Sequence, residues 1–215
     1  MTVRAKICGL NTAEAMEAAV GGGAAYVGLV FYPPSPRAVS PPEAARLAAL
    51  VPERTARVGV FVDADDDAIA AVLDAVDLDF LQLHGREPPD RVAGIRRRFA
   101  RPVIKAIKLA GRADLAAAAR YSDAADRLLF DAKPPKTMAH ALPGGNAVAF
   151  DWRLLAGTSW PVPWMLSGGL DAANVAEAVT ATGASEVDVS SGVEDEPGRK
   201  STAKIAAFLA AVGRL

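Results

Sequence analysis

Short apolar runs alternate along the chain with longer stretches that have helical character. In the first run, from Val3 to Cys8, apolar side chains alternate with Arg4 and Lys6, and this period of two is typical of a strand. Similar runs recur to the end of the chain. The pattern predicts eight strands, over Val3–Cys8, Tyr26–Phe31, Val58–Val62, Phe80–Leu83, Pro102–Ile107, Arg127–Asp131, Val162–Leu166 and Glu186–Val189.

The stretches between these runs carry helix signals. Thr12 is placed to cap the first helix, and glycines at positions 21–23 follow its end. Pro41-Pro42 suits the first turn of the second helix. The segment from Ala132 to Ala149 is the longest irregular piece, and such loops are usually functional or disordered. Helices are predicted after Thr12, over Pro41–Val51, Asp65–Val76, Pro88–Phe99, Ala113–Tyr121, briefly near Asp151, and over Ala172–Thr182 and Thr202–Val212.

Eight strands alternating with eight helices indicate a parallel sheet with right-handed crossovers. The predicted fold is α/β, a single (β/α)8 TIM barrel that spans residues 1–215 as one domain. The alternative is an open doubly wound sheet. A Gly-x-Gly-x-x-Gly turn after the first strand would favour that alternative, and Cys8-Gly9-Leu10-Asn11 does not contain one.

Charge and composition exclude several classes of protein. The formal net charge of -1 gives no electrostatic reason to expect a nucleic acid partner. No apolar run is long enough to span a bilayer, so no membrane association is expected. Cys8 is the only cysteine, which rules out an intramolecular disulfide and favours a reducing, cytoplasmic location. The sequence shows no long apolar stripe that would indicate a dimer interface.

Polar residues gather where the predicted strands end, and in barrels this is where chemistry takes place. Glycines and serines follow strands seven and eight, as Ser167-Gly168-Gly169 and Ser190-Ser191-Gly192. Such turns let backbone N–H groups approach an anion, and these two loops commonly bind phosphate in this fold. They can also be plain tight turns. The other polar residues at strand ends are Cys8, Asp63, Gln82, His84, Lys105, Lys108, Asp131 and Asp188.

Cys8 and Asp131 are the candidates for acid–base chemistry. Cys8 ends the first strand, where a thiolate can act as a base, although a free cysteine is as often an inert buried residue. Asp131 follows an apolar run at the end of the sixth strand, and a carboxyl group in apolar surroundings tends to keep its proton, which suits a general acid. Its alternative role is a helix cap or a partner for Lys133 or Arg127.

Three further residues are candidates for substrate binding. Arg37 lies in a proline-rich segment that limits its freedom, and a held arginine can bind a carboxylate through two hydrogen bonds. The alternative is a solvated loop charge, which is the usual role of an arginine. His84 can hydrogen-bond a substrate or form a structural link, and Asp188 ends the eighth strand. No His/Cys cluster has metal-ligand spacing, so no zinc site is expected.

The motifs taken together resemble those of the phosphoribosylanthranilate isomerases. Lys6-Ile7-Cys8-Gly9-Leu10 is similar to the opening motif of that family, and the resemblance covers essentially the whole chain. The remaining motifs occur in the same order, and they are Phe31-Tyr32-Pro33-Pro34-Ser35-Pro36-Arg37, Gln82-Leu83-His84-Gly85, Phe130-Asp131-Ala132-Lys133, Phe150-Asp151-Trp152, Ser167-Gly168-Gly169-Leu170 and Asp188-Val189-Ser190-Ser191-Gly192-Val193-Glu194.

The resemblance implies a cofactor-free Amadori rearrangement of a small phosphorylated substrate in tryptophan biosynthesis. It implies that Asp131 is the general acid, that Cys8 is the general base and that Arg37 holds the anthranilate carboxylate. Phosphate is then expected at Gly168, Gly169, Ser190, Ser191 and Gly192. Activity on a related aminoaldose of histidine biosynthesis also fits this chemistry, and the resemblance implies a monomer.

Two features depart from the family pattern. Asn146-Ala147-Val148 stands where a further glycine is usual, and Ser201 stands where an aspartate is common. Two other functions remain open from the sequence. One is a sugar-phosphate epimerase, which commonly uses a metal. The other is a barrel that binds a phosphorylated metabolite without turning it over.

Overall fold

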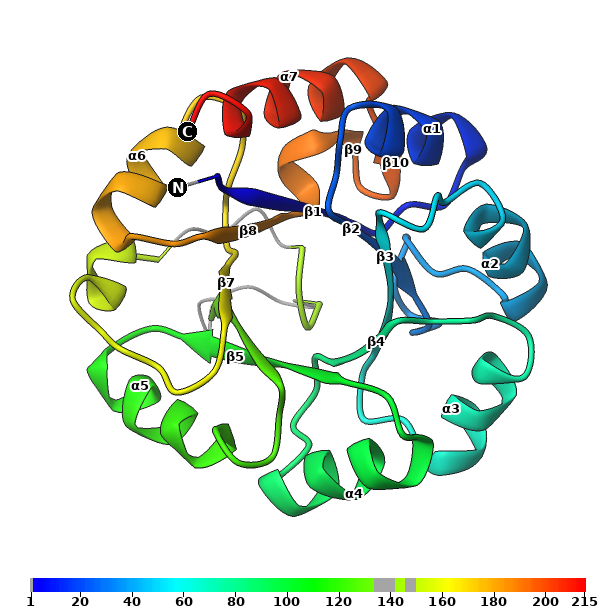
Figure 1. Ribbon diagram of the computed structural model, residues 1–215, viewed down its shortest axis with the longest axis horizontal. Helices are drawn as coiled ribbons and strands as arrows, with labels where there is room; N and C mark the ends of the chain where they lie inside the picture. The colour runs from blue at the N-terminus through cyan, green and yellow to red at the C-terminus, as the bar shows by residue number, and fades with distance from the viewer. Residues whose placement is uncertain (1, 134–141, 146–149) are drawn as a thin grey trace.

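Eight parallel strands form a closed barrel in the order in which they occur along the chain (Figure 1). The computed structural model describes residues 2–133, 142–145 and 150–215. The predicted (β/α)8 fold is confirmed. The strands are β1 (Arg4–Cys8), β2 (Tyr26–Val30), β3 (Ala56–Phe61), β4 (Phe80–Leu83), β5 (Val103–Leu109), β6 (Arg127–Ala132), β7 (Trp164–Leu166) and β8 (Glu186–Val189).

Helices surround the barrel, and β1 closes it by pairing with both β2 and β8. Between β6 and β7, the described residues form only a short 3-10 helix, η2 (Trp152–Leu155), where the sequence predicted a short helix. No helix in the described part of the chain is long and apolar enough to cross a membrane. The α-helices are α1 (Ala13–Gly21), α2 (Pro41–Ala48), α3 (Asp66–Leu73), α4 (Pro89–Phe99), α5 (Arg112–Ala118), α6 (Val175–Thr182) and α7 (Thr202–Val212), and the 3-10 helix η1 (Ala119–Tyr121) follows α5.

Local hydrogen bonds explain where several helices begin. The Thr12 side chain accepts from the backbone N–H of Ala15, so it caps α1 as predicted. Ser40 and Glu43 form a reciprocal capping box at the start of α2. At α6 the predicted start was three residues too early, because the Asp171 carboxylate accepts from the N–H groups that follow it and holds them in a turn.

The strands bury side chains on both faces, as expected for a parallel barrel. Outward-facing residues pack against the helices. Inward-facing residues fill the barrel, and Cys8, Val30 and Val60 form a small cluster of their own. Because side chains alternate along a strand, every second residue of each strand faces inward. The barrel interior contains Tyr26, Val58, Ile104, Ala106, Leu129 and Met165.

Several boundaries differ from the sequence prediction by a few residues. β3 begins two residues earlier and β5 ends two residues later than predicted. β7 begins at Trp164 and not at Val162, since Pro163 has no N–H group to donate to a neighbouring strand. Most of the predicted irregular segment, including the atypical Asn146-Ala147-Val148, lies outside the described residues.

A small antiparallel hairpin after β8 was not predicted. The 3-10 helix η3 (Ser191–Val193) leads into β9 (Glu194–Glu196), which pairs with β10 (Arg199–Lys200). The hairpin lies beside α1 and β1 (Figure 1). Its turn contacts the loop after β2, where a Cβ atom at Gly198 would lie 2.5 Å from the Pro36 carbonyl oxygen.

Candidate active site

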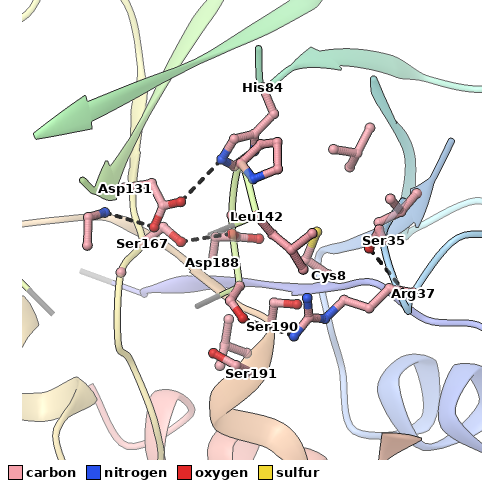
Figure 2. A pocket seen from close by; sticks show the side chains of 18 of the residues that line it. Cys8, Ser35, Arg37, His84, Asp131, Leu142, Ser167, Asp188, Ser190 and Ser191 are labelled. Atoms are coloured by element: carbon pink, nitrogen blue, oxygen red, sulfur yellow. Dashed lines mark hydrogen bonds and ion pairs between the residues drawn. The ribbon is translucent and has the colours of Figure 1, made fainter. Parts of the chain in front are cut away.

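One pocket opens at the carboxyl ends of the barrel strands, and most of the predicted site residues line it (Figure 2). Gly192 is the exception. A Cβ atom there would collide with the carbonyl oxygen of Leu170, so this glycine lets η3 pack tightly against the loop after β7. The predicted residues that line the pocket are Cys8, Arg37, His84, Asp131, Gly168, Gly169, Asp188, Ser190 and Ser191.

Asp131 enters the pocket from β6, two residues beyond the buried Leu129 and on the same inward face. Its Oδ1 accepts from the N–H of Ala132 at 2.8 Å, and its Oδ2 lies 3.2 Å from Nε2 of His84. The side chain is nine-tenths buried but remains open to the pocket (Figure 2). One oxygen is thus held by the backbone, while the other faces the cavity and the His84 ring.

Cys8 enters from the end of β1, and Lys6 lies two residues before it on the same inward face. Gly28 of β2 makes room for both side chains. A Cβ atom at Gly28 would lie 2.9 Å from Cys8 Sγ and 3.2 Å from Lys6 Nζ. Burial raises the pKa of the Cys8 thiol above its usual value, and the positive charge of Lys6 opposes that effect. The ammonium group therefore favours the thiolate form.

Asp188 joins Lys6 to the loop after β7. Its Oδ1 accepts from Lys6 Nζ at 2.8 Å, and its Oδ2 accepts from Ser167 Oγ at 3.0 Å. Burial disfavours the charged form of Lys6 and so lowers its pKa. The negative charge of Asp188 outweighs this effect, and the pKa of Lys6 is raised above its usual value. This buried charge pair lies next to Cys8 in the barrel interior. Sequence analysis did not single out Lys6. Its period-two spacing from Cys8 is the signal that could have identified it.

Arg37 reaches the pocket from the loop after β2, and its guanidinium group is held on two edges. Nε and Nη2 each donate to the Glu194 carboxylate at 2.7 Å, and Nη2 also donates to the Gly145 carbonyl at 3.0 Å. Arg37 is therefore not a solvated loop charge. Within the described residues Nη1 has no hydrogen-bond partner, and Arg37 lines the pocket. A carboxylate ligand can be bound there.

Lys200 of the hairpin connects Glu194 to the loop after β8. Its Nζ donates to Glu194 at 2.7 Å, to the Ser190 carbonyl at 2.9 Å and to Ser190 Oγ at 3.2 Å. Burial disfavours the charged form of Glu194 and so raises its pKa. Hydrogen bonds and positive charge from Arg37 and Lys200 outweigh this effect and lower the pKa of the carboxyl group. Neither residue was predicted, because the contact of Glu194 with Arg37 joins positions 157 residues apart, and Lys200 lies in a hairpin that the hydrophobic pattern does not indicate.

The turn after β7 depends on glycine. Gly168 and Gly169 have φ values of 88° and 71°, in the left-handed region that favours this residue. A Cβ atom at Gly168 would lie 2.8 Å from the Ala132 nitrogen. Trp152 and Asn174 donate to the carbonyl groups of these glycines and so fix the turn. The backbone N–H of Gly169 makes no hydrogen bond to another described residue, which leaves it available to an anion.

Residues 142–145, the described part of the loop after β6, also line the pocket. A Cβ atom at Gly144 would lie 2.9 Å from His84 Nε2 and 3.3 Å from Asp131 Oδ2. At Gly145 it would lie 2.5 Å from Arg37 Nη1. The two glycines thus allow this loop to approach the carboxyl group and the guanidinium group closely.

The fold and pocket define a (β/α)8-barrel protein whose site combines a thiol, a carboxyl group, a held arginine and glycine–serine turns. No group of three or more His, Cys, Asp or Glu side chains among the described residues is arranged to hold a metal ion. Residues 5–211 match the family model of N-(5'phosphoribosyl)anthranilate (PRA) isomerase. The chain belongs to this family.

Individual relatives agree with this result. The chain is 59% identical over 215 residues to N-(5'-phosphoribosyl)anthranilate isomerase of Rhodospirillum centenum, with all of both chains covered. It is similar to the crystal structure of phosphoribosyl anthranilate isomerase from Thermotoga maritima, with a TM-score of 0.88, 37% identity and coverage of 99% and 100% of the two chains. A structure of such an isomerase in complex with reduced 1-(o-carboxyphenylamino)-1-deoxyribulose 5-phosphate has a TM-score of 0.85, 36% identity and the same coverage.

Proposed function

We propose that the protein isomerises N-(5-phosphoribosyl)anthranilate to 1-(2-carboxyphenylamino)-1-deoxyribulose 5-phosphate, a step of tryptophan biosynthesis. The observation that carries this proposal is that a thiol and a carboxyl group, from β1 and β6, face one pocket from different sides (Figure 2). The pocket also presents a cationic group at Arg37 and glycine–serine turns. An aromatic carboxylate and a sugar phosphate match these two features.

In the proposed reaction, Asp131 gives its proton to the ribose ring oxygen, and the bond between that oxygen and C1 breaks. The nitrogen lone pair forms a Schiff base with C1. The Cys8 thiolate then removes the proton from C2, and the electron pair forms the enolamine. Tautomerisation to the ketone completes the rearrangement. Only protons and electron pairs move, so substrate and product have the same composition.

Binding roles follow from which groups remain available. We assign the substrate carboxylate to Arg37, whose Nη1 has no hydrogen-bond partner among the described residues. We assign the phosphate to Gly168, Gly169, Ser190 and Ser191, with Gly192 shaping the second turn. His84 and Asp188 line the pocket and remain candidates for substrate contact, although their polar atoms are already engaged with neighbouring side chains.

We further propose that the protein acts as a monomer in the cytoplasm. Among the described residues, the exposed large hydrophobic side chains are Leu50, which follows α2, and Leu215 at the end of the described chain. They do not form the apolar patch that a stable dimer needs. A reducing compartment keeps the Cys8 thiol free, as a general base must be.

A turnover assay tests the proposed activity. Purified protein is mixed with N-(5-phosphoribosyl)anthranilate, and the loss of anthranilate fluorescence is followed with and without a chelator. We expect turnover that the chelator does not change. Binding of the reduced product analogue without turnover of the substrate would contradict the proposal, because the barrel would then be a binding protein.

A further inference from the structure

Gln82 is a fully buried amide inside the barrel, next to the pocket but not part of its wall. It lies on β4 two residues before His84, and both side chains face inward. Its Nε2 lies 2.8 Å from His84 Nδ1, while His84 Nε2 lies 3.2 Å from Asp131 Oδ2. Three polar side chains therefore form a chain that ends at the proposed acid.

The amide of Gln82 decides where the His84 ring carries its proton. When the amide N–H donates to Nδ1, that nitrogen is an acceptor and the proton of the neutral ring lies on Nε2. His84 then donates to Asp131 Oδ2. A reversed amide would accept from Nδ1–H and leave a lone pair on Nε2. That lone pair would face the Asp131 carboxylate without a proton between them, or would take up the proton of the acid.

The unpaired end of the amide argues against a purely structural role. Gln82 Oε1 is buried and has no hydrogen-bond partner among the described residues. A half-satisfied amide is unfavourable in a barrel interior, where an apolar side chain of the same size would pack without this cost. The hydrogen bond to His84 is what an amide adds at this position and an apolar residue does not.

We propose that Gln82 is a positioning residue for the acid: its amide holds His84 as a hydrogen-bond donor toward Asp131. This inference rests on the proposed function, because it assigns to Asp131 the role of general acid. The donor on Nε2 stabilises the carboxylate that remains after Asp131 has given its proton to the ring oxygen. It also prevents the His84 ring from accepting that proton in place of the substrate.

Two variants separate this role from packing. Gln82→Glu keeps the shape of the side chain but presents only acceptors when ionised, so it draws a proton to His84 Nδ1. Gln82→Met keeps the approximate volume without a hydrogen bond. For both we expect kcat to fall by about 10- to 100-fold, as for the loss of one hydrogen bond to a charged group, with little change in KM. Circular dichroism checks that each variant is folded.

The protonation of His84 is read separately, by nitrogen NMR of histidine-labelled protein without substrate. A His84→Asn variant assigns the His84 signals, since the chain contains two histidines. We expect Nδ1 to be unprotonated in the wild type and protonated in Gln82→Glu. An unprotonated Nδ1 in Gln82→Glu, or a change at Nδ1 with an unaltered kcat, would overturn the proposal.

Gln82→Met gives an independent result if Gln82→Glu does not fold. Wild-type kcat in Gln82→Met would overturn the proposal, because Gln82 would then be a packing residue. The two failures are distinguishable: the proposed function fails if the wild type does not turn over the substrate, whereas the positioning role is read from His84 and from differences between variants.

Discussion

Neighbouring charges control the reactive groups of the pocket at the scale of single residues. Cys8 is buried, and a buried thiol resists ionisation. Lys6 lies beside it and is held in place by Asp188. Asp131 has one oxygen fixed by a backbone N–H and the other beside His84. Each proposed proton-transfer group therefore has a fixed position beside a polar or charged neighbour.

Removing either proton-transfer group should abolish most of the turnover. We expect Cys8→Ser to lower kcat by about 10²- to 10⁴-fold with little change in KM, because a hydroxyl group is a much poorer base than a thiolate. Asp131→Asn should act similarly, since an amide has no proton to give to the ring oxygen. Steady-state kinetics measure both effects. Near-normal turnover in Cys8→Ser would make Cys8 a packing residue and direct the search for a base to His84 or Asp188.

The raised pKa of Cys8 predicts a pH dependence for its alkylation. Only the thiolate reacts, and burial moves its formation to a higher pH than in a free cysteine. The rate of iodoacetamide modification should therefore rise with pH across a range above the usual cysteine pKa. Cys8 is the only thiol in the chain, so mass spectrometry reports this site alone. A midpoint at or below that of a small free thiol, measured in the same buffers, would contradict the prediction.

At the scale of elements, strand ends could be predicted from the sequence and the hairpin could not. Cys8 and Asp131 end apolar runs, and the barrel topology brings such ends to one face. The hairpin strands β9 and β10 contain mainly charged residues and have three and two residues, so they show no hydrophobic alternation. The roles of Glu194 and Lys200 depend on contacts with Arg37 and Ser190, which no local pattern encodes.

The hairpin should control how Arg37 is presented. Glu194→Gln removes the negative charge between Arg37 and Lys200 and leaves two buried cations without it. We expect KM to rise about tenfold or more and the free energy of unfolding to fall by about 3–5 kcal/mol. Kinetics and urea unfolding measure the two effects.

Glu196→Gln is the matched control for this variant, because Glu196 is exposed on the same hairpin and pairs with Arg199 at the surface. It should change the free energy of unfolding by no more than about 1 kcal/mol and leave KM unaltered. Equal effects of the two variants on KM would show that the hairpin does not position Arg37.

The turn after β7 is predicted to bind the substrate phosphate. Gly169→Asp should weaken competition by inorganic phosphate strongly, because a carboxylate would repel the anion and fill the space that it needs. Gly157→Asp is a suitable control: Gly157 has a φ of 67° and does not line the pocket. Inhibition constants for phosphate are the measurement. An unchanged constant in Gly169→Asp would place the phosphate elsewhere.

At the scale of the whole molecule, the alternation of strands and helices was sufficient to predict the closed barrel. The errors arose where side chains act across turns. Asp171 delays the start of α6 by capping the turn before it, and Pro163 shortens β7. The pairing of Lys6 with Asp188 was not visible in a strand pattern that reports burial but not contacts. The hydrophobic pattern thus predicts the barrel fold, whereas contacts between residues distant in sequence determine the positions of the site residues.

The surface of the barrel predicts the state of association. Among the described residues, Leu50 and Leu215 are the exposed large hydrophobic side chains, at 39% and 37%, and two such side chains are too few to form the apolar centre of an interface. A stable dimer would need to bury about 800 Å² on each partner, much of it apolar at the centre. We therefore expect sedimentation velocity to give one species near the chain mass of 22.3 kDa, at micromolar concentrations and at low and high salt. Kinetic constants should not depend on protein concentration, because every group assigned to the reaction comes from the same chain. A species of twice that mass that persists on dilution would contradict the prediction, and a mass that falls with rising salt would indicate association through surface charges.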